Sequence, residues 1–398
     1  MRLLVVSHTE HYRDDNGGVV GWGATVRELS QLARLFDELV HLAPLHDSPA
    51  PASALPYADP RVRFEPLRPT GGRRLREKLG AAWAAPAFWQ RLSSLAAGAD
   101  LIHVRAPANV AALAMLRLAL RRRPAPWWAK YAGNWRPEPG TDFVSFRLQR
   151  RFLARRWPGL AVTVNGAWPN QPSHVRTFDN PCLDASEVAT ARAATTEKRL
   201  DAPLRLLYVG VLSAAKGAGR ALDIAARLEA RRPGSVQLEL IGDGPERPAM
   251  ESQATRLGLA DRAIFHGWQP RPQLGAHYAA AHVLLLPSRS EGWPKVLSEA
   301  MAYGTVPVAS DVSAIAATLA RFGCGRTART DDLDGFVQAI EGYLEAPDLW
   351  RRESEAARAA ADAFTYATYL DAVRSLVREA WGLELGGGRT VDNTRSSP

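Results

Sequence analysis

The sequence predicts an α/β protein with two parallel-sheet domains. Apolar runs typical of buried strands alternate with amphipathic helical patterns, first over residues 1–183 and again over residues 204–364. A polar, alanine-rich stretch without a strand pattern, residues 184–203, separates the two series and is interpreted as a linker. The chain has 398 residues, which is enough for two domains of ordinary size.

The first series has the alternation that a parallel sheet requires. Because parallel strands end at one edge of their sheet, ligand-binding groups are expected at that edge. In order, the pattern predicts a strand at residues 3–7, a flexible glycine-rich loop at 17–23, a helix at 25–36, strands at 40–43, 62–65 and 101–104, a helix at 110–122 and a strand at 127–131.

The second series repeats the alternation and ends in helices. The polar, glycine-rich tail, residues 386–398, is expected to be disordered. In order, the pattern predicts strands at residues 204–209, 236–241, 264–267, 283–286 and 305–310, helices at 219–231, 248–257 and 273–281, and a largely helical region over 348–378.

The segment after the strand at 283–286 is the most informative part of the chain. Its loop contains Glu291 and Gly292, and Pro294 stands where a helix containing Glu299 should begin. A helix start favours an anion, and glycine lets a ligand approach the backbone closely. Carboxylates beside an anion site suit the hydroxyl groups of a sugar or a ribose. The pattern therefore indicates a nucleotide-sugar site, unless both glutamates are ordinary surface charges.

Glu291 and Glu299, with seven residues between them and Ala-Met-Ala-x-Gly following, resemble the E-x7-E signature of the retaining GT-B glycosyltransferases of family 4. The resemblance implies two Rossmann-like domains facing across a cleft, with a last helix, residues 365–385, that crosses back to the N-terminal domain. It also implies that Glu291 contacts the donor sugar and Glu299 the ribose. The backbone of Gly292, Trp293 and Pro294 would face the diphosphate.

Residues 208–217 resemble a second element of this family, G-R-L-x-x-x-K-G. Gly210 matches its glycine, and Lys216 stands at the position of the lysine that contacts the donor diphosphate. Val211 replaces the family's arginine, which removes one positive charge. We hypothesise that Lys295, at the start of the following helix, supplies the missing charge.

Three further elements resemble donor-binding segments of the family. Gly242 and Gly244 belong to a Gly-Asp-Gly-Pro turn, which implies a sharp turn near the nucleotide. The Phe-His-Gly run at residues 265–267 resembles an F-x-G element near the base. Gly17 and Gly18 match glycines that lie near the donor phosphates in the family.

The acceptor side is less distinct. Many relatives carry a histidine at the end of a later strand of the N-terminal domain, but residues 130–135 contain none. Either Tyr131 or Asn134 takes over that contact, or catalysis proceeds without it. His103 is another candidate for an acceptor or sugar contact, although a single histidine that ends a strand is more often structural.

No metal or cofactor is expected. The Asp-Leu-Asp run at residues 332–334 is interpreted as a helix N-terminus, with Asp331 or Asp332 as N-cap, rather than as a metal-binding D-x-D. No carboxylate–histidine constellation is recognisable. The chain has no Walker-type phosphate loop, which argues against an NTPase.

The net charge of +9 and the arginine-rich first half raise the question of a partner. Arginines near aromatic residues could bind an anionic membrane surface, or they could simply be solvated helix faces. Nucleic acid is not expected, because no binding motif accompanies the charge. The arginines are Arg73, Arg74, Arg76, Arg117, Arg121, Arg122, Arg123, Arg147, Arg150, Arg151, Arg155 and Arg156.

The expected location is the cytoplasm, with peripheral attachment to the inner membrane face as a further hypothesis. The chain has two cysteines, its N-terminus has a strand pattern rather than a signal peptide, and no apolar run is long enough to span a membrane.

The predicted function is the transfer of a hexose-type unit from a nucleoside diphosphate sugar to a carbohydrate or lipid-linked acceptor, with retention of anomeric configuration, in cell-surface glycan or glycolipid synthesis. Two alternatives are kept. One is an inactive GT-B protein that binds a nucleotide sugar or a partner, suggested by Val211 and the missing histidine. The other is a phosphorylase or epimerase, whose characteristic groups are not found.

Overall fold

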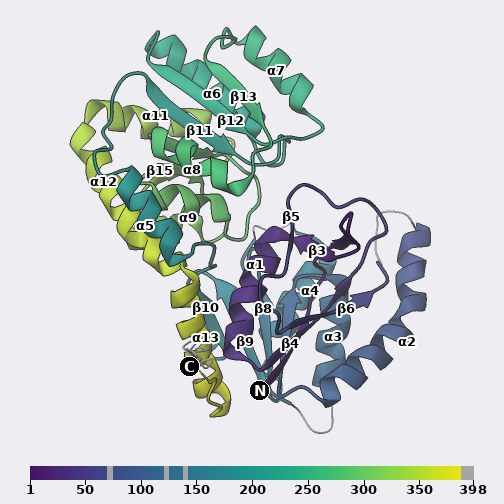
Figure 1. Ribbon diagram of the computed structural model, residues 1–398. Coiled ribbons are helices and arrows are strands. Elements are labelled where there is room, and N and C mark those ends of the chain that lie inside the picture. The colour runs from purple at the N-terminus through teal and green to yellow at the C-terminus, as the bar shows by residue number, and fades with distance from the viewer. Residues whose placement is uncertain (70–74, 121–124, 138–141, 387–398) are drawn as a thin grey trace, which may run out of the picture.

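The structure, a computed structural model, describes residues 1–69, 75–120, 125–137 and 142–386, and the side chains of these residues except those of 75–84. Two parallel sheets with helices on both faces form two domains (Figure 1). The predicted α/β fold with two parallel-sheet domains is confirmed. Some predictions concern residues or side chains outside those described, namely Arg73, Arg74, Arg76, Arg121, Arg122, Arg123 and the tail at 387–398.

The N-terminal sheet has seven parallel strands in the order β10-β9-β8-β7-β1-β4-β6. Apolar residues of α2, α3 and α4, such as Leu92, Met115 and Leu153, cover one face. The strands of this sheet and the helices around it are β1 (Arg2–Val6), α1 (Gly23–Leu32), η1 (Ala33–Leu35), β4 (Glu38–Pro44), β6 (Val62–Leu67), α2 (Leu75–Ala97), β7 (Leu101–Ala106), α3 (Asn109–Ala119), β8 (Trp127–Tyr131), α4 (Val144–Leu153), β9 (Leu160–Asn165) and β10 (Val175–Phe178).

A small antiparallel sheet replaces the flexible loop expected at residues 17–23. It consists of β2 (His11–Arg13), β3 (Val19–Trp22) and β5 (Ala54–Pro56). Gly17, at a φ of +78°, and Gly18 form the turn between β2 and β3, and the Gly18 N–H donates to Asp14 Oδ1 over 2.7 Å. The expectation was wrong because a tight hairpin turn needs the same residues as a loop, glycine and aspartate.

The stretch interpreted as a linker, residues 184–203, contains a helix, α5 (Ala185–Ala194). Asp184 and Glu187 form a reciprocal capping box at its start. The D-x-x-E spacing is a readable signal for a helix start, and the stretch interpreted as a linker therefore includes one helix that the sequence analysis did not predict.

The C-terminal sheet has six parallel strands in the order β13-β12-β11-β14-β15-β16. Every strand predicted between residues 204 and 310 is present, and Asp332 caps α11 by accepting from the Gly335 N–H over 2.9 Å. The elements are β11 (Leu204–Val209), α6 (Ala218–Arg231), β12 (Val236–Ile241), α7 (Arg247–Arg256), β13 (Ala263–Gly267), α8 (Arg271–Ala280), β14 (Val283–Leu286), α9 (Lys295–Ala302), β15 (Val306–Ser310), α10 (Ile315–Phe322), β16 (Arg326–Ala328), α11 (Leu333–Glu345), α12 (Pro347–Ala360) and η2 (Ala361–Phe364).

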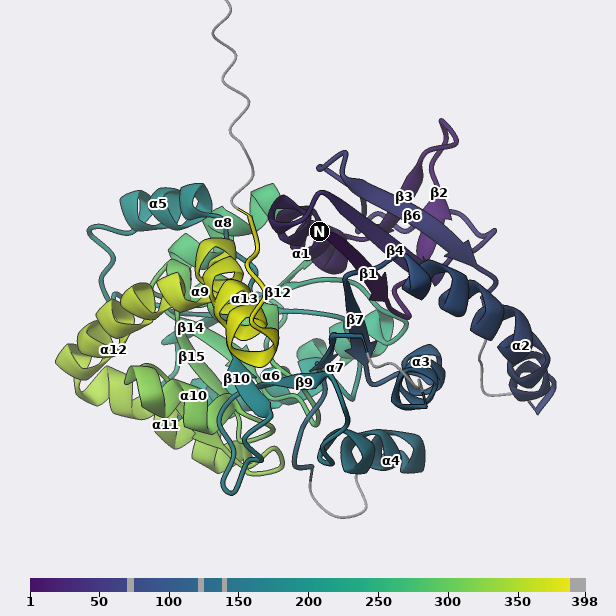
Figure 2. The ribbon, with the colours of Figure 1, turned by 90° about the horizontal axis from the view of Figure 1, so that it is seen from below.

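The last helix, α13 (Tyr366–Trp381), returns to the N-terminal domain. It runs along α1 and covers, together with α1, the face of the N-terminal sheet opposite to α2 and α3 (Figures 1 and 2). Val373 and Val377 pack there against Leu29 and Leu32. The predicted crossing-back helix is therefore present. Neither α13 nor any other helix of the described residues has the length and apolar character needed to cross a membrane.

Candidate active site

The two loops that follow β11 and β12, at the carboxyl ends of strands in the C-terminal sheet, pack against each other through glycines. The Gly210 N–H donates to Ile241 O over 2.9 Å. A Cβ atom on Gly242 would lie 1.9 Å from Gly210 O, and one on Gly244 would lie 2.4 Å from Leu212 O. Any larger residue at these two positions would push the loops apart. The structure thus brings together Gly210, Gly242 and Gly244, as the sequence motifs indicate.

The loop after β11 is also fixed to the loop between β14 and α9, residues 287–294, which we call the signature loop. Ser288 Oγ donates to Lys216 O over 3.1 Å. A Cβ atom on Gly217 would lie 2.1 Å from Pro287 O, and Gly217 has a φ of +83°. These contacts hold Lys216 beside the signature loop.

Lys216 and Glu291, the two predicted catalytic residues, form an ion pair. Lys216 Nζ lies 2.7 Å from Glu291 Oε1, and 42% of the lysine side chain is exposed. The ammonium group can donate to an anion, and the carboxylate can accept from sugar hydroxyls. Val211, in the same loop, is 53% exposed and provides no charge.

The start of α9 differs in part from the sequence prediction. The helix begins at Lys295, so Pro294 is the N-cap residue rather than the first helical residue. The Trp293 ring is buried, stacks on Phe364 at a centroid distance of 5.0 Å and donates through Nε1 to Ser298 Oγ. Its side chain therefore belongs to the core and not to a donor-binding surface, which leaves only its backbone available.

Gly292 brings the signature loop against the opposite domain. A Cβ atom at this position would lie 1.8 Å from Ala132 O, in the N-terminal domain. Asn165 Nδ2 also donates to Ala132 O, over 3.2 Å. The glycine therefore permits a close contact between the two domains, in addition to any contact with a ligand.

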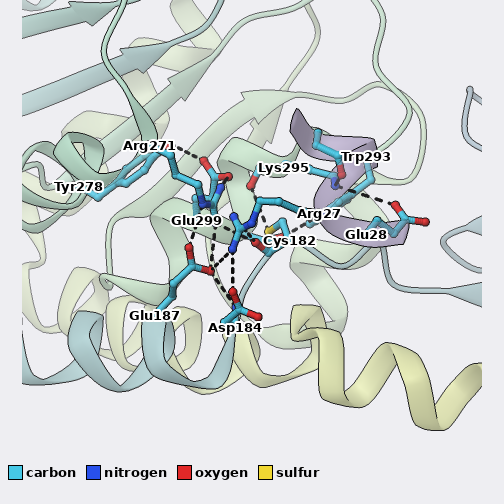
Figure 3. Close-up of polar contacts among 12 residues, drawn as sticks. Arg27, Glu28, Cys182, Asp184, Glu187, Arg271, Tyr278, Trp293, Lys295 and Glu299 are labelled. Atoms are coloured by element: carbon cyan, nitrogen blue, oxygen red, sulfur yellow. Dashed lines mark hydrogen bonds and ion pairs between the residues drawn. The ribbon is translucent and has the colours of Figure 1, made fainter. Parts of the chain in front are cut away.

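The Lys295 ammonium group contacts the N-terminal domain in this structure. Its Nζ donates to Ala24 O over 3.2 Å and lies 4.0 Å from Glu28 Oε2, both in α1 of the N-terminal domain (Figure 3). The hypothesis of compensation by Lys295 is therefore not supported, because this side chain reaches across the domain interface.

Glu28 is the centre of a buried charge cluster that the sequence analysis missed. Arg105 and Lys130 each approach Glu28 Oε1 to 2.7 Å, and Lys295 completes what we call the Glu28 cluster. Burial alone would raise the pKa of Glu28, but the three cations hold it well below its ordinary value. Arg105 and Lys130 lie near the carboxyl ends of β7 and β8. Ligand-binding groups are expected at this edge of a parallel sheet, so the position of these two residues could have identified them as candidates.

Glu299 is enclosed by two side chains of α8. Arg271 contacts Glu299 Oε1, and Tyr278 donates to Glu299 Oε2 over 3.0 Å (Figure 3). Arg271 also binds Glu187, on the helix within the linker. Burial acts to lower the pKa of Arg271, but the Glu299 carboxylate beside it produces a net increase. The carboxylate expected to bind the ribose is thus part of a structural network.

Two of the three proposed acceptor-side contacts are in the core. His103 is fully buried, stacks on Trp128 at 3.9 Å and has a pKa that burial lowers well below its ordinary value. Tyr131 is 1% exposed, and its hydroxyl accepts from Arg150. Neither side chain can reach a ligand in this conformation. Asn134 is half-buried and remains a candidate.

Gly17 and Gly18 lie in the exposed turn of the β2–β3 hairpin. Among the described residues, no hydrogen bond or ion pair joins this turn to the Lys216–Glu291 pair. Their expected place beside the donor phosphates stays a prediction.

A carboxylate–histidine group is present, contrary to the sequence analysis. Glu239, His266 and His277 place one potential ligand atom each within 4.8 Å of one another. The three residues lie on three different elements, β12, β13 and α8, so no short local motif indicates the group.

The architecture and the site can be compared with known proteins. Sucrose-phosphate synthase from Thermosynechococcus elongatus superposes on this chain with a TM-score of 0.71 at 22% sequence identity. The superposition covers 96% of this chain and 99% of the synthase chain. Anabaena Alr3699/HepE in complex with UDP and glucose superposes with a TM-score of 0.64 at 18% identity, over 95% and 100% of the two chains. The chain has the GT-B fold.

Sequence comparison agrees for the C-terminal domain. Residues 195–360 match the family described as glycosyl transferases group 1. The lipopolysaccharide 1,6-galactosyltransferase of Salmonella typhimurium is 39% identical over 113 residues, which are 28% of this chain and 31% of that protein. The matched segments cover about a third to about half of the length of such curated relatives. The GT-B chain is thus similar to glycosyltransferases in the part that carries Lys216, Glu291 and Glu299.

Proposed function

We propose that this GT-B chain is a family 4 glycosyltransferase that moves a hexose-type unit from a nucleoside diphosphate sugar to an acceptor hydroxyl with retention of anomeric configuration. The observation that carries the proposal is the Lys216–Glu291 ion pair. It lies where the loop after β11 meets the signature loop, and it combines a partner for phosphate with a partner for sugar hydroxyls.

In the proposed reaction the donor's C–O bond to the diphosphate breaks, and the acceptor oxygen forms the new bond on the same face of the sugar. Lys216 and the free N–H groups at the start of α9 stabilise the departing diphosphate. A leaving-group oxygen takes the acceptor proton, so the enzyme needs no nucleophile of its own. One well-placed donor of this kind contributes about 2.7–4 kcal/mol to transition-state stabilisation.

Contact between the two domains has a role in this mechanism. Gly292 and Lys295 both touch the N-terminal domain, at Ala132 and Ala24. A closed arrangement excludes water from the donor, because hydrolysis competes with transfer. Both residues flank the start of α9, so closure and donor binding would act on one segment.

The relatives suggest a donor and an acceptor class. The structure of HepE with UDP and glucose favours a uridine diphosphate sugar as the first donor to test. The similarity to a lipopolysaccharide galactosyltransferase favours a cell-surface glycan or glycolipid acceptor. We expect no metal ion to take part in the transfer step, since Lys216 and the helix N–H groups provide the positive charge.

The surface of α4 supports contact with an anionic membrane, which would bring the enzyme to a lipid-linked acceptor. Phe143, Val144 and Leu148 are 72%, 60% and 59% exposed, and Arg147 and Arg151 are exposed on the same short helix. Exposed apolar residues between arginines suit the headgroup region. The protein should sediment with phosphatidylglycerol vesicles, and Leu148→Ser should reduce the bound fraction. Equal binding to neutral phosphatidylcholine vesicles would contradict attachment to an anionic membrane.

Thermal denaturation with UDP, GDP, ADP, CDP and dTDP tests the proposed function. A ligand at 100 times its Kd adds about 2.7 kcal/mol to the free energy of unfolding. We expect one nucleotide to stabilise the wild type and to have a smaller effect on Lys216→Ala. If a nucleotide binds but no panel of UDP-sugars yields transfer or hydrolysis, the inactive GT-B alternative gains support. No stabilisation by any nucleotide would overturn the proposal.

A further inference from the structure

The half-buried group of Glu239, His266 and His277 is built from three separate elements. His266 Nε2 and His277 Nδ1 lie 3.1 Å and 2.6 Å from the same oxygen, Glu239 Oε2. The two imidazole rings meet edge to face with centroids 4.6 Å apart. The three polar side chains thus converge on one point beside β13, the edge strand of the C-terminal sheet.

The register of the sheet is irregular at His266. Leu240 pairs with Phe265, but Ile241 pairs with Gly267, so His266 is an extra residue in β13. Phe265 packs on the core beside Leu240, so alternation along β13 directs His266 to the opposite face of the sheet. Glu239 lies between Leu238 and Leu240, whose side chains enter the core on the opposite face. His266 therefore lies beside Glu239, and His277 of α8 reaches the same carboxylate oxygen.

We propose that Glu239, His266 and His277 form a binding site for a divalent transition-metal ion, with zinc as the first candidate. Two imidazole nitrogens and one carboxylate oxygen are a ligand set that zinc uses, with bonds of about 2.0–2.2 Å. Tetrahedral bonds of that length need ligand atoms about 3.3 Å apart, so the group requires only a small expansion. The side chains are 20–26% exposed, which leaves room for water as the fourth ligand.

The ion would fasten α8 to the sheet edge. His277 precedes Tyr278, and the same helix begins with Arg271; both Tyr278 and Arg271 hold Glu299. The site therefore provides a route by which a metal ion adjusts the position of Glu299 and, with it, nucleotide affinity. This last consequence rests on the proposed function, whereas metal binding itself does not.

Isothermal titration of the metal-free full chain with ZnCl2 tests the site, and cobalt(II) spectra report the ligand geometry. We expect one equivalent to bind, with at least tenfold weaker binding in His277→Ala and in Glu239→Gln, which keeps the shape of the side chain. His46→Ala, which removes a half-buried histidine in the other domain, should bind as the wild type does. Absence of saturable binding, or equal binding by all four proteins, would overturn the proposal. Failure of nucleotide binding alone would leave the zinc titration unchanged.

Discussion

Lys216 Nζ lies 2.7 Å from Glu291 Oε1, although 75 positions separate the two residues and each stands on a different loop. The pair neutralises a cation and a carboxylate beside the start of α9. An incoming diphosphate would offer Lys216 a second, more highly charged partner. Glu291 would then be free to accept a hydrogen bond from a sugar hydroxyl. Binding of the diphosphate would therefore make both residues available to the donor.

Replacement of Lys216 by alanine should weaken binding of the preferred nucleoside diphosphate by about 10- to 100-fold. The reason is the loss of one charge-assisted hydrogen bond, typically about 1.5–3 kcal/mol. Isothermal titration measures the change. Arg256→Ala, which removes an exposed cation at the end of α7, is the matched control and should bind normally. Equal affinities for both variants would show that Lys216 does not contact the diphosphate.

Replacement of Gly292 by alanine should disturb the domain contact. The new methyl group would overlap Ala132 O, and relief of an overlap of this kind costs about 1–3 kcal/mol or separates the domains. A lower melting temperature or a larger radius of gyration in X-ray scattering would report this. Gly342→Ala is a suitable control, because nothing lies within 4 Å of the added Cβ in α11 and helix propensity improves by roughly 0.5–1 kcal/mol. An unchanged, compact Gly292→Ala protein would contradict the domain contact.

Replacement of Glu299 by alanine should lower stability even without a ligand. Arg271 would lose one of its carboxylates and the buried Tyr278 hydroxyl its acceptor, which together cost about 2–4 kcal/mol. Tyr278→Phe removes only one hydrogen bond and should cost about 1 kcal/mol. Urea denaturation compares the two variants. Should Glu299→Ala be the more stable of the two, the network around Glu299 does not hold the fold.

The sequence predicts the C-terminal half better than the N-terminal half, and the reason is local. The predicted strands from 204 to 310 are short apolar runs bounded by glycine or proline, and Lys216 and Glu291 lie in motifs at their ends. In the N-terminal half, β9 and β10 were not predicted, and the loop at 17–23 was a hairpin. Turn residues look alike in loops and hairpins, so sequence alone does not separate them.

Burial accounts for the site residues that were misassigned or missed. His103 and Tyr131 end strands, as ligand-binding residues often do, yet both rings are buried. Lys295 follows a phosphate-type loop but crosses to the other domain. Glu28 sits in a helix whose pattern suggests a solvated charge, although its side chain is 1% exposed. Each of these outcomes depends on contacts between distant segments, which no local pattern contains.

The buried lysine of the Glu28 cluster should make stability depend on pH. Burial lowers the pKa of Lys130 to about 7, although Glu28 acts in the opposite direction. The unfolded chain retains a pKa of about 10.4 for this amine. Between these values the unfolded state binds more protons, so the contribution of Lys130 to the free energy of unfolding increases with pH, by at most about 1.4 kcal/mol per unit.

Lys130→Met removes this titration and leaves Arg105 and Lys295 beside Glu28. The free energy of unfolding of the wild type minus that of the variant should therefore rise from pH 7 to pH 9. Urea denaturation at pH 7, 8 and 9 gives this difference, in which the titration of other groups cancels. A difference that stays constant over this range would mean that Lys130 keeps an ordinary pKa.

The return of α13 to the N-terminal domain has a consequence for biosynthesis. Leu29, Leu32 and Trp128 present an apolar face that Val373 and Val377 cover. The ribosome makes these last residues only after the entire C-terminal domain. The apolar face of the nascent N-terminal domain therefore stays exposed to solvent until the C-terminal domain and α13 have been synthesised. During this interval the growing chain is exposed to aggregation and is a natural client for chaperones.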